Sequence, residues 1–366
     1  MFTSIFVFLI VISILVLIHE FGHFIVARRA GIWVEEFGFG IPPRVFGKKI
    51  GETIYSLNLL PFGGFVRLHG ENSEEDITDP ERAFLGQSKK TRAVVITAGV
   101  LMNLILAVVC FVVVYLFSGI PRETDKVGII EIASGSPAEV SGFKVGDIIK
   151  KVDGKDIKGN DDFVRVVSDG IGRDLVFTIQ RSGDQIEIKA VPRRDPPRNE
   201  GPLGVVISTT EIYYPPLWQR PFYGIYYGLK EAFFWTGVVV GGFIQLFQQI
   251  FQGTLPEEIA GPVGIFVLTS KAASYGILTL INFVGILSVN LAILNIIPFP
   301  ALDGGRFLFV MIESVFGKRL VPKIENLLHS IGMVILLFLL LAVTYNDMRR
   351  LIEFGGISGF IEKVLK

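Results

Sequence analysis

Two histidines and a glutamate stand within five residues near the N-terminus, in the run His19-Glu20-Phe21-Gly22-His23. Positions i and i+4 share one face of a helix, so both imidazoles can reach a single metal ion. Glu20 points about 100° away from that face, where it can accept a proton from a water activated by the metal. Zinc polarises a carbonyl group and brings the pKa of water towards neutrality. The run therefore predicts a zinc hydrolase with Glu20 as general base.

The surroundings of this motif are apolar. Half of the 366 residues are hydrophobic, 19% are charged and the mean hydropathy is +0.54, which is more apolar than a typical soluble domain. The excess lies in residues 2–18, 93–117, 277–299 and 329–345, each about long enough to cross the ~30 Å bilayer core as a helix. Placing histidine and glutamate at the end of such a span costs free energy, so their presence indicates a functional site. The alternative is that these polar residues only mark a helix end in the headgroup layer.

Catalytic zinc usually has three protein ligands and one open position, so a third ligand is needed. The candidate is Asp303, in a run from Asn295 to Gly305 that closes the apolar stretch 277–299. Prolines in this run break the helix, and Gly304 and Gly305 let the chain approach a neighbour. Taken alone, Asp303 could equally cap a turn. Taken with the histidine pair, it is the better candidate for the third ligand.

Between the first two apolar stretches, residues 25–92 are polar and include Gly38-Phe39-Gly40. Alternation over 53–59 and 65–68 predicts a small glycine-rich β-sheet close behind the catalytic helix. A transmembrane substrate helix must unwind to expose a peptide bond, and an exposed strand edge can replace its lost hydrogen bonds. We therefore expect this sheet to clamp the substrate; the alternative is a hairpin that only seals the site.

Residues 120–195 have the composition of a soluble domain, and the run from Ser136 to Ile149 resembles a PDZ domain of bacterial protease-associated type. That resemblance implies a groove in which a peptide adds as an extra strand. The alternative is a β-rich spacer without a ligand. Residues 196–221 indicate a linker, and 222–252 are apolar and aromatic with a few charges.

The histidine motif, the Leu302–Gly305 loop, Gly38–Gly40, the run Gly261–Ile265 and the inserted PDZ-like region together resemble bacterial site-2 proteases, of the type that regulates sigma-E. The resemblance covers essentially the whole chain. It implies intramembrane proteolysis of a single-span substrate, an anti-sigma factor, after a first cut outside the membrane. The best-known members carry two tandem PDZ domains, whereas this chain has one such region.

The same resemblance implies a role for individual residues. It assigns zinc binding to His19, His23 and Asp303, and the catalytic base to Glu20. It places the substrate near the following residues: Asn290, Asn295, Gly38, Phe39 and Gly40. For Asn290 and Asn295 a helix–helix hydrogen bond is an equal alternative. We expect that simpler role for Asn103, and expect His69 and His329 to be ordinary surface or interface residues.

The expected fold is a multi-span α-helical membrane protein with about four transmembrane helices, a membrane-associated β-sheet and an inserted extracytoplasmic PDZ domain. The expected segments are, in order, a first span with the histidine motif (1–24), the glycine-rich sheet region (25–92), a second span (93–117), the PDZ domain (120–195), a linker with an interfacial amphipathic helix (196–275), a third span ending in the Asp303 loop (277–305), a fourth span (329–347) and an amphipathic tail (348–366).

The orientation follows from the shared metal. The first and third spans must end at the same membrane face, so both run in one direction and the second runs back. Basic residues mark that face as cytoplasmic by the positive-inside rule: Arg28, Arg29, Lys48, Lys49, Lys89, Lys90, Arg92, Lys318, Arg319 and Lys323. Residues 222–252 must then not form a further membrane crossing, because one more crossing would place Asp303 at the opposite face from the histidines. We expect them to lie along the outer interface. The expected location is a bacterial inner membrane, with the PDZ domain outside.

Other classes of protein fit less well. The net charge is zero, which predicts no nucleic-acid partner, and the single cysteine, Cys110, excludes an intrachain disulfide. A zincin with a soluble catalytic domain would take its third ligand from a soluble helix. A zinc transporter would show further ionisable residues in its spans or internal repeats. A PDZ scaffold would not need Glu20.

Overall fold

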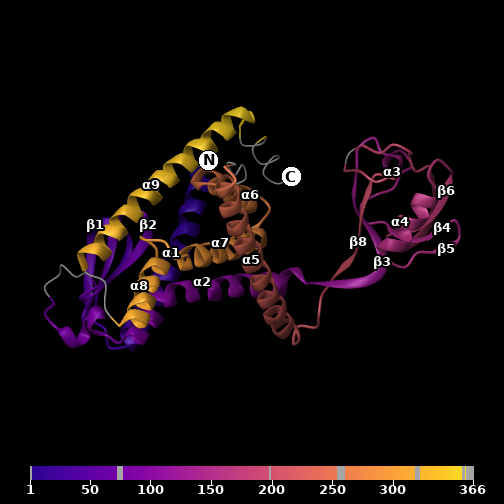
Figure 1. The fold of residues 1–366 in the computed structure, drawn as a ribbon. Coiled ribbons are helices and arrows are strands. Elements are labelled where there is room, and N and C mark those ends of the chain that lie inside the picture. Colours follow the sequence, from indigo (N-terminus) through magenta and orange to yellow (C-terminus); the bar gives the residue numbers. More distant parts are fainter. Residues whose placement is uncertain are drawn as a thin grey trace. The chain divides into compact units, whose positions relative to one another are not determined.

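The computed structural model describes residues 2–71, 77–197, 199–253, 260–317, 322–356 and 359. The chain forms two compact units, a helical unit made of residues 1–117 and 220–366 and a smaller unit made of residues 118–219 (Figure 1). We call the smaller one the PDZ-like unit.

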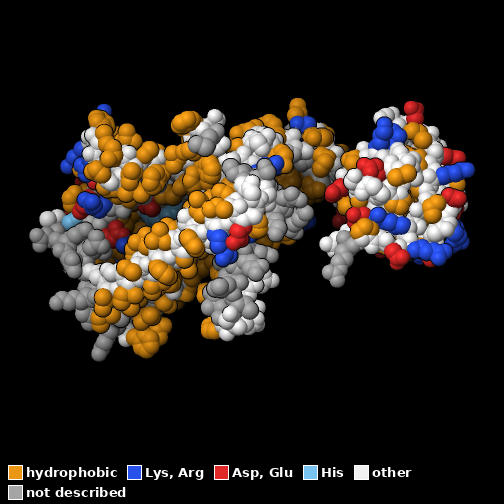
Figure 2. All heavy atoms as spheres, turned by 90° about the horizontal axis from the view of Figure 1, so that it is seen from above, with side chains coloured by type: hydrophobic (Ala, Val, Ile, Leu, Met, Phe, Trp, Pro, Cys, Tyr) orange, Lys and Arg blue, Asp and Glu red, His pale blue; other side chains and the backbone are white. Residues whose placement is uncertain are grey.

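Four helices of the described residues are long and apolar enough to cross a membrane. They are α1 (Phe2–Arg29), α2 (Lys89–Ser118), α7 (Ile277–Ile296) and α9 (Pro322–Glu353). Large apolar side chains on these helices, such as Phe6, Leu101 and Phe338, are exposed, and Figure 2 shows apolar side chains over much of the helical unit. A surface of this kind suits lipid and not water. The four predicted spans are therefore confirmed.

Three further helices complete this unit: α5 (Arg220–Phe251), α6 (Pro262–Ser274) and α8 (Asp303–Phe316). Helix α5 is not among the four candidate spans. Its Gly228 packs closely on Val112 of α2, and α5 shares a small core with α2 and α7. An interfacial position for 222–252 stays a prediction. The region 196–275 is not only linker and interfacial helix, because α6 is a separate helix that contacts α1, α7 and α9.

The predicted glycine-rich sheet is present as β1 (Val34–Ile50) and β2 (Thr53–Leu68), followed by short 3-10 helices at Pro80–Arg82 and Phe84–Gly86. Its register is unusual because β2 folds back along β1. Gly38 pairs with both Phe65 and Ser56, and Phe39 pairs with both Gly64 and Leu57. The first half of β1 is thus central, with hydrogen-bonded neighbours on both sides. Two edges of this sheet stay open among the described strands: the Arg44–Ile50 half of β1 and the Gly64–Leu68 part of β2, each of which has a paired neighbour on one side only.

The PDZ-like unit is a sheet of strands in the order β7-β6-β4-β3-β8, with β5 paired to β4. Its elements are β3 (Ile120–Ile132), α3 (Pro137–Val140), β4 (Ile148–Val152), β5 (Lys155–Asp156), α4 (Asn160–Asp169), β6 (Leu175–Arg181), β7 (Asp184–Ala190) and β8 (Val205–Tyr213). Its own core includes fully buried Val127, Val152 and Phe177.

The predicted linker 196–221 is wrong over β8. This strand pairs antiparallel with β3, about eighty positions earlier in the chain, and forms one edge of the sheet beside α4. The prolines near β8 lie outside the strand and give the segment the composition of a linker. The strand with which β8 pairs is distant in sequence. The predicted amphipathic tail 348–366 is described only in part: α9 continues to Glu353, and most residues after 356 lie outside the described part.

Candidate metal centre

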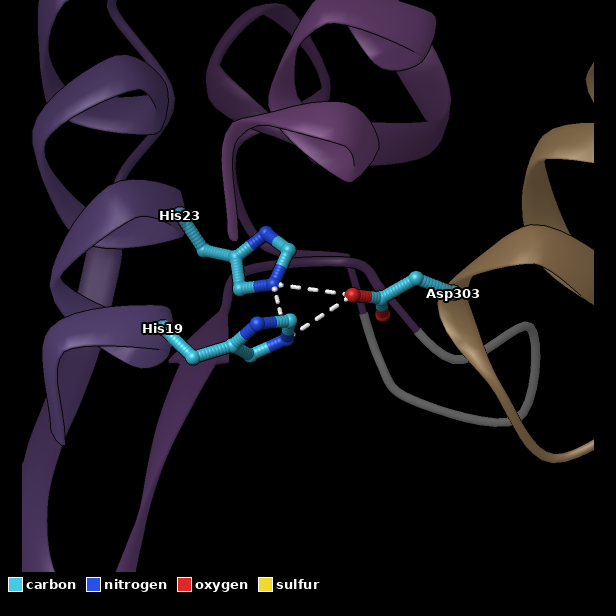
Figure 3. A group of neighbouring side chains, drawn as sticks. All are labelled: His19, His23 and Asp303. Carbon is cyan, nitrogen blue, oxygen red and sulfur yellow. Dashed lines mark hydrogen bonds and ion pairs between the residues drawn. The ribbon is translucent and has the colours of Figure 1, made fainter. Parts of the chain in front are cut away.

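The two histidines lie one turn apart on α1 and point the same way, as their spacing predicts (Figure 3). The two Nε2 atoms are 3.2 Å apart, and His19 is buried. Nδ1 of His23 donates a hydrogen bond to the carbonyl oxygen of Val95 at 2.8 Å. That bond places the proton of a neutral ring on Nδ1, so Nε2 presents a bare lone pair.

Asp303 reaches this pair from the first turn of α8. Its Oδ2 lies 2.9 Å from Nε2 of His19 and 3.2 Å from Nε2 of His23. The preceding loop is tightly folded: a Cβ on Gly304 would lie 2.1 Å from the carbonyl oxygen of Ile297, and one on Gly305 would lie 2.4 Å from that of Phe299. Only glycine fits at both positions, so the glycine pair allows the loop to deliver the carboxylate.

These three atoms fit a zinc ion. They belong to a group whose ligand atoms lie within 4.8 Å of one another. Ligands of a tetrahedral zinc at ordinary bond lengths stand roughly 3.3 Å apart. The bare nitrogen of His23 faces the carboxylate and the other imidazole without a proton of its own, so a cation between the three atoms would satisfy them. Two imidazoles and one carboxylate leave the fourth position of a catalytic zinc open.

Helix α2 supports the pair in ways that local sequence patterns did not reveal. The amide of Asn103, which is fully buried, lies 3.2 Å from Nδ1 of His19. A histidine that binds metal through Nε2 usually hydrogen-bonds through its other nitrogen, and this contact orients the ring. A Cβ on Gly99 would lie 2.3 Å from Nε2 of His23, so Gly99 leaves the space in which a metal would sit.

We expect Asn103→Ala to weaken zinc affinity by roughly 10–100-fold, the usual cost of losing such an outer contact. The measurement is competition for zinc against a chelating dye, with purified protein. Thr97→Ala is the matched control, since the Thr97 hydroxyl bonds carbonyl groups of its own helix, those of Ala93 and Val94. Unchanged zinc affinity in Asn103→Ala would show that the amide serves helix packing alone, as we expected from the sequence.

Ion pairs connect the element that carries Asp303 to the rest of the helical unit. Arg92 of α2 lies 2.7 Å from the Glu313 carboxylate of α8, and Lys89 donates to the Glu313 carbonyl oxygen. Arg306, one turn after Asp303, pairs with Glu71 just beyond β2. Buried or half-buried pairs of this kind fix geometry more reliably than they add stability.

Glu20 lies in the wall of a cavity of about 540 Å³ that also includes His23 and Asp303. The side chains of Phe65 and Val66, from the open edge of β2, form another part of that wall. A Cβ on Gly64 would lie 3.8 Å from Cγ of Glu20, so the edge runs directly beside the expected base. The expected base, two of the three possible metal ligands and an unpaired strand edge therefore share one cavity, and the third ligand, His19, lies 2.9 Å from Asp303.

The residues expected near the substrate are placed differently from one another. Asn290 is exposed and its amide bonds only the Ile286 carbonyl of its own helix, at 3.3 Å. Neither Asn290 nor Asn295 belongs to the cavity wall. Gly38 and Phe39 are covered on both sides by β2, so they are not the open strand edge. Gly40 packs closely on the Leu60 carbonyl and has a positive φ of 81°, which favours glycine.

Two histidines that were expected to be ordinary surface or interface residues make specific contacts in the structure. His69 is buried; it bonds Glu35 at 2.8 Å and accepts from the Asp79 amide at 3.1 Å, so it holds the loop after β2. His329 of α9 lies in the wall of the cavity that also contains Glu20 and Asp303. Both contacts join segments far apart in sequence, so ligand spacing could not have revealed them.

Comparison with known proteins agrees with this geometry. Residues 7–339 match the model of peptidase family M50, which is most of the chain. The chain belongs to peptidase family M50. M50 relatives named zinc metalloprotease RasP occur in Geobacillus kaustophilus, 32% identical over 95% of this chain and 98% of that protein, and in Oceanobacillus iheyensis, 29% identical over 95% and 99%. The regulator of sigma-W protease RasP of Bacillus subtilis is 28% identical over 94% and 98%.

The protein is accordingly a zinc metalloendopeptidase of the site-2 protease type. Among solved structures, the PDZ domain of an SdrC-like protein from Listeria monocytogenes is 16% identical to it and covers 24% of this M50 chain and 90% of that domain, with a TM-score of 0.21.

Proposed function

We propose that His19, His23 and Asp303 hold one zinc ion, that Glu20 is the general base, and that the protein cuts single-span membrane proteins within the bilayer. The observation that carries this proposal is the convergence of the three ligand atoms beside a cavity that Glu20, His23 and Asp303 line, between helices apolar enough to cross a membrane. A PDZ scaffold has no use for a carboxylate at that place, and a zinc transporter would be expected to show further ionisable residues in its spans or internal repeats.

The side chains divide the work. A zinc ion held by His19, His23 and Asp303 would supply Lewis acidity to the scissile carbonyl and would lower the pKa of the attacking water. Glu20 accepts the water proton as the new carbon–oxygen bond forms and returns it to the departing nitrogen. Val95 and Asn103 hold the imidazoles in register, and the ion pair of Arg306 with Glu71 steadies the helix that presents Asp303.

The substrate clamp belongs to the Gly64–Leu68 edge. An unwound segment can add there as a strand, with alternate backbone groups bonded to β2 and its scissile peptide bond beside Glu20. Gly38, Phe39 and Gly40 act behind this edge by supporting its register. In the PDZ-like unit, the open edge of β8 beside α4 is the place where a peptide ligand would add.

We infer that the substrates include an anti-sigma factor, since a relative in Bacillus subtilis is named for regulating sigma-W. We also infer a bacterial inner-membrane location, with the metal centre near the cytoplasmic face and the PDZ-like unit outside. The basic residues of the 25–92 region support this orientation. Of the basic residues after Asp303, Lys318 and Arg319 lie outside the described part of the chain.

The test is cleavage by the full-length protein in lipid nanodiscs, with a model single-span substrate. We expect a strong chelator to abolish cleavage and added zinc to restore it, because the three ligands surround one exchangeable ion. Cleavage products are followed by mass spectrometry. A substrate that is cut equally well with chelator present, or never cut although zinc is bound, would contradict the proposed function.

A further inference from the structure

His329 of α9 holds the loop that leads to Asp303. Its Nδ1 lies 3.0 Å from the backbone nitrogen of Ala301, which can only donate. Nδ1 is therefore the acceptor, and the neutral ring carries its hydrogen on Nε2. Ala301 has a positive φ of 81°, a conformation that costs energy for any residue but glycine and needs support from its neighbours.

The ring has little freedom to turn. Phe309 packs edge-on against it, with ring centroids 5.4 Å apart. Nearly one turn further along α9, a Cβ on Gly332 would lie 2.4 Å from the Pro300 carbonyl oxygen, so the helix backbone presses directly on the loop. The direction of Nε2 is thus set by three contacts of α9 with the Pro300–Phe309 segment.

Nε2 itself is buried and, among the described residues, has no hydrogen-bond partner. A buried donor without an acceptor destabilises the fold, so its retention points to a partner that arrives later. His329 belongs to the wall of the cavity that contains Glu20 and Asp303. The neighbouring cation in that wall, Arg306, is already paired with Glu71.

An unwound substrate has the complementary need. Each peptide unit released from a transmembrane helix brings a carbonyl oxygen that has lost its helical donor into the cavity. The β2 edge can satisfy the groups on one side of an added strand only, because alternate residues point their backbone bonds the opposite way. A donor across the cavity from that edge would satisfy a group that the edge leaves free.

We propose that the Nε2–H of His329 donates a hydrogen bond to a backbone carbonyl of the unwound substrate. His329 is then a substrate-binding residue as well as the brace of the Asp303 loop. This inference rests on the proposed function, since it requires an extended substrate in the catalytic cavity.

Two replacements separate the roles. In His329→Asn the side-chain oxygen can take the place of Nδ1, so the Ala301 amide keeps a partner while the Nε2 donor is lost. In His329→Gln the side-chain nitrogen can take the place of Nε2, while the acceptor for Ala301 is lost. Ser330→Asn, at the exposed next position of α9, controls for a new amide on this helix.

Affinity for a fluorescent single-span peptide is measured in nanodiscs with full-length Glu20→Gln protein, loaded to one zinc per chain. We expect His329→Asn to weaken binding roughly tenfold, the effect of one lost hydrogen bond, and to keep its zinc affinity. We expect His329→Gln to bind the peptide more tightly than His329→Asn but to hold zinc more weakly.

Peptide affinity unchanged in His329→Asn would overturn the inference, as would equal losses of both affinities in the two variants. A failure of the proposed function looks different, because the protein with native Glu20 and His329 would then not cut the peptide at all.

Discussion

Glu20→Gln protein should retain about one zinc per chain and cleave a model single-span substrate roughly 10³-fold more slowly than the native protein. The amide is nearly isosteric with the carboxylate but cannot accept the proton of the attacking water, and a positioned base contributes about 10²–10⁴-fold. Zinc should stay because its three proposed ligands are untouched. The measurements are metal analysis and initial rates in nanodiscs.

Glu52→Gln is the matched control for this prediction. Glu52 is an exposed carboxylate on the turn between β1 and β2, paired with Arg82, and its neutralisation should leave the rate nearly unchanged. Near-native cleavage by Glu20→Gln would remove Glu20 from the mechanism. Loss of zinc in that variant would instead make Glu20 part of the metal site.

Asp303→Ala should lose zinc under conditions in which the native protein retains it, and should lose cleavage with it. We expect the zinc affinity to fall by more than the roughly 10–100-fold that an outer-shell contact contributes. The physical reason is that two imidazoles remain without the one anionic donor, whose oxygen lies 2.9 Å and 3.2 Å from their Nε2 atoms. Chelator competition and metal analysis measure the affinity.

Asp125→Ala, at an exposed position of the PDZ-like unit, controls for the loss of a carboxylate elsewhere. A second variant, Asp303→Asn, keeps the volume of the side chain and tests the charge alone. Full zinc retention with normal activity in Asp303→Ala would exclude Asp303 as a ligand. Thermal unfolding of each variant, with and without zinc, shows whether the loop has kept its fold.

The sequence alone determined those features that depend on near neighbours in the chain. His19 and His23 share a helix face because helical geometry brings positions i and i+4 together, and α1 places them as predicted. The membrane helices follow from length and composition, which need no knowledge of packing. Asp303 could be predicted as a ligand because proline and glycine after an apolar span indicate a loop, and because a histidine pair needs a third ligand.

Only the tertiary structure decided which distant residues serve that site. Asn103 and Gly99 reach the histidines from another helix, and His329 reaches the Asp303 loop from a third. The open strand edge beside Glu20 falls on Gly64–Leu68 and not on Gly38, because β2 folds back and covers both sides of the first half of β1. Strand β8 has linker-like flanks, and its pairing with β3 becomes visible only after folding. In each case the decisive contact joins segments far apart in the chain. The residues next to a side chain in sequence do not predict a contact of this kind.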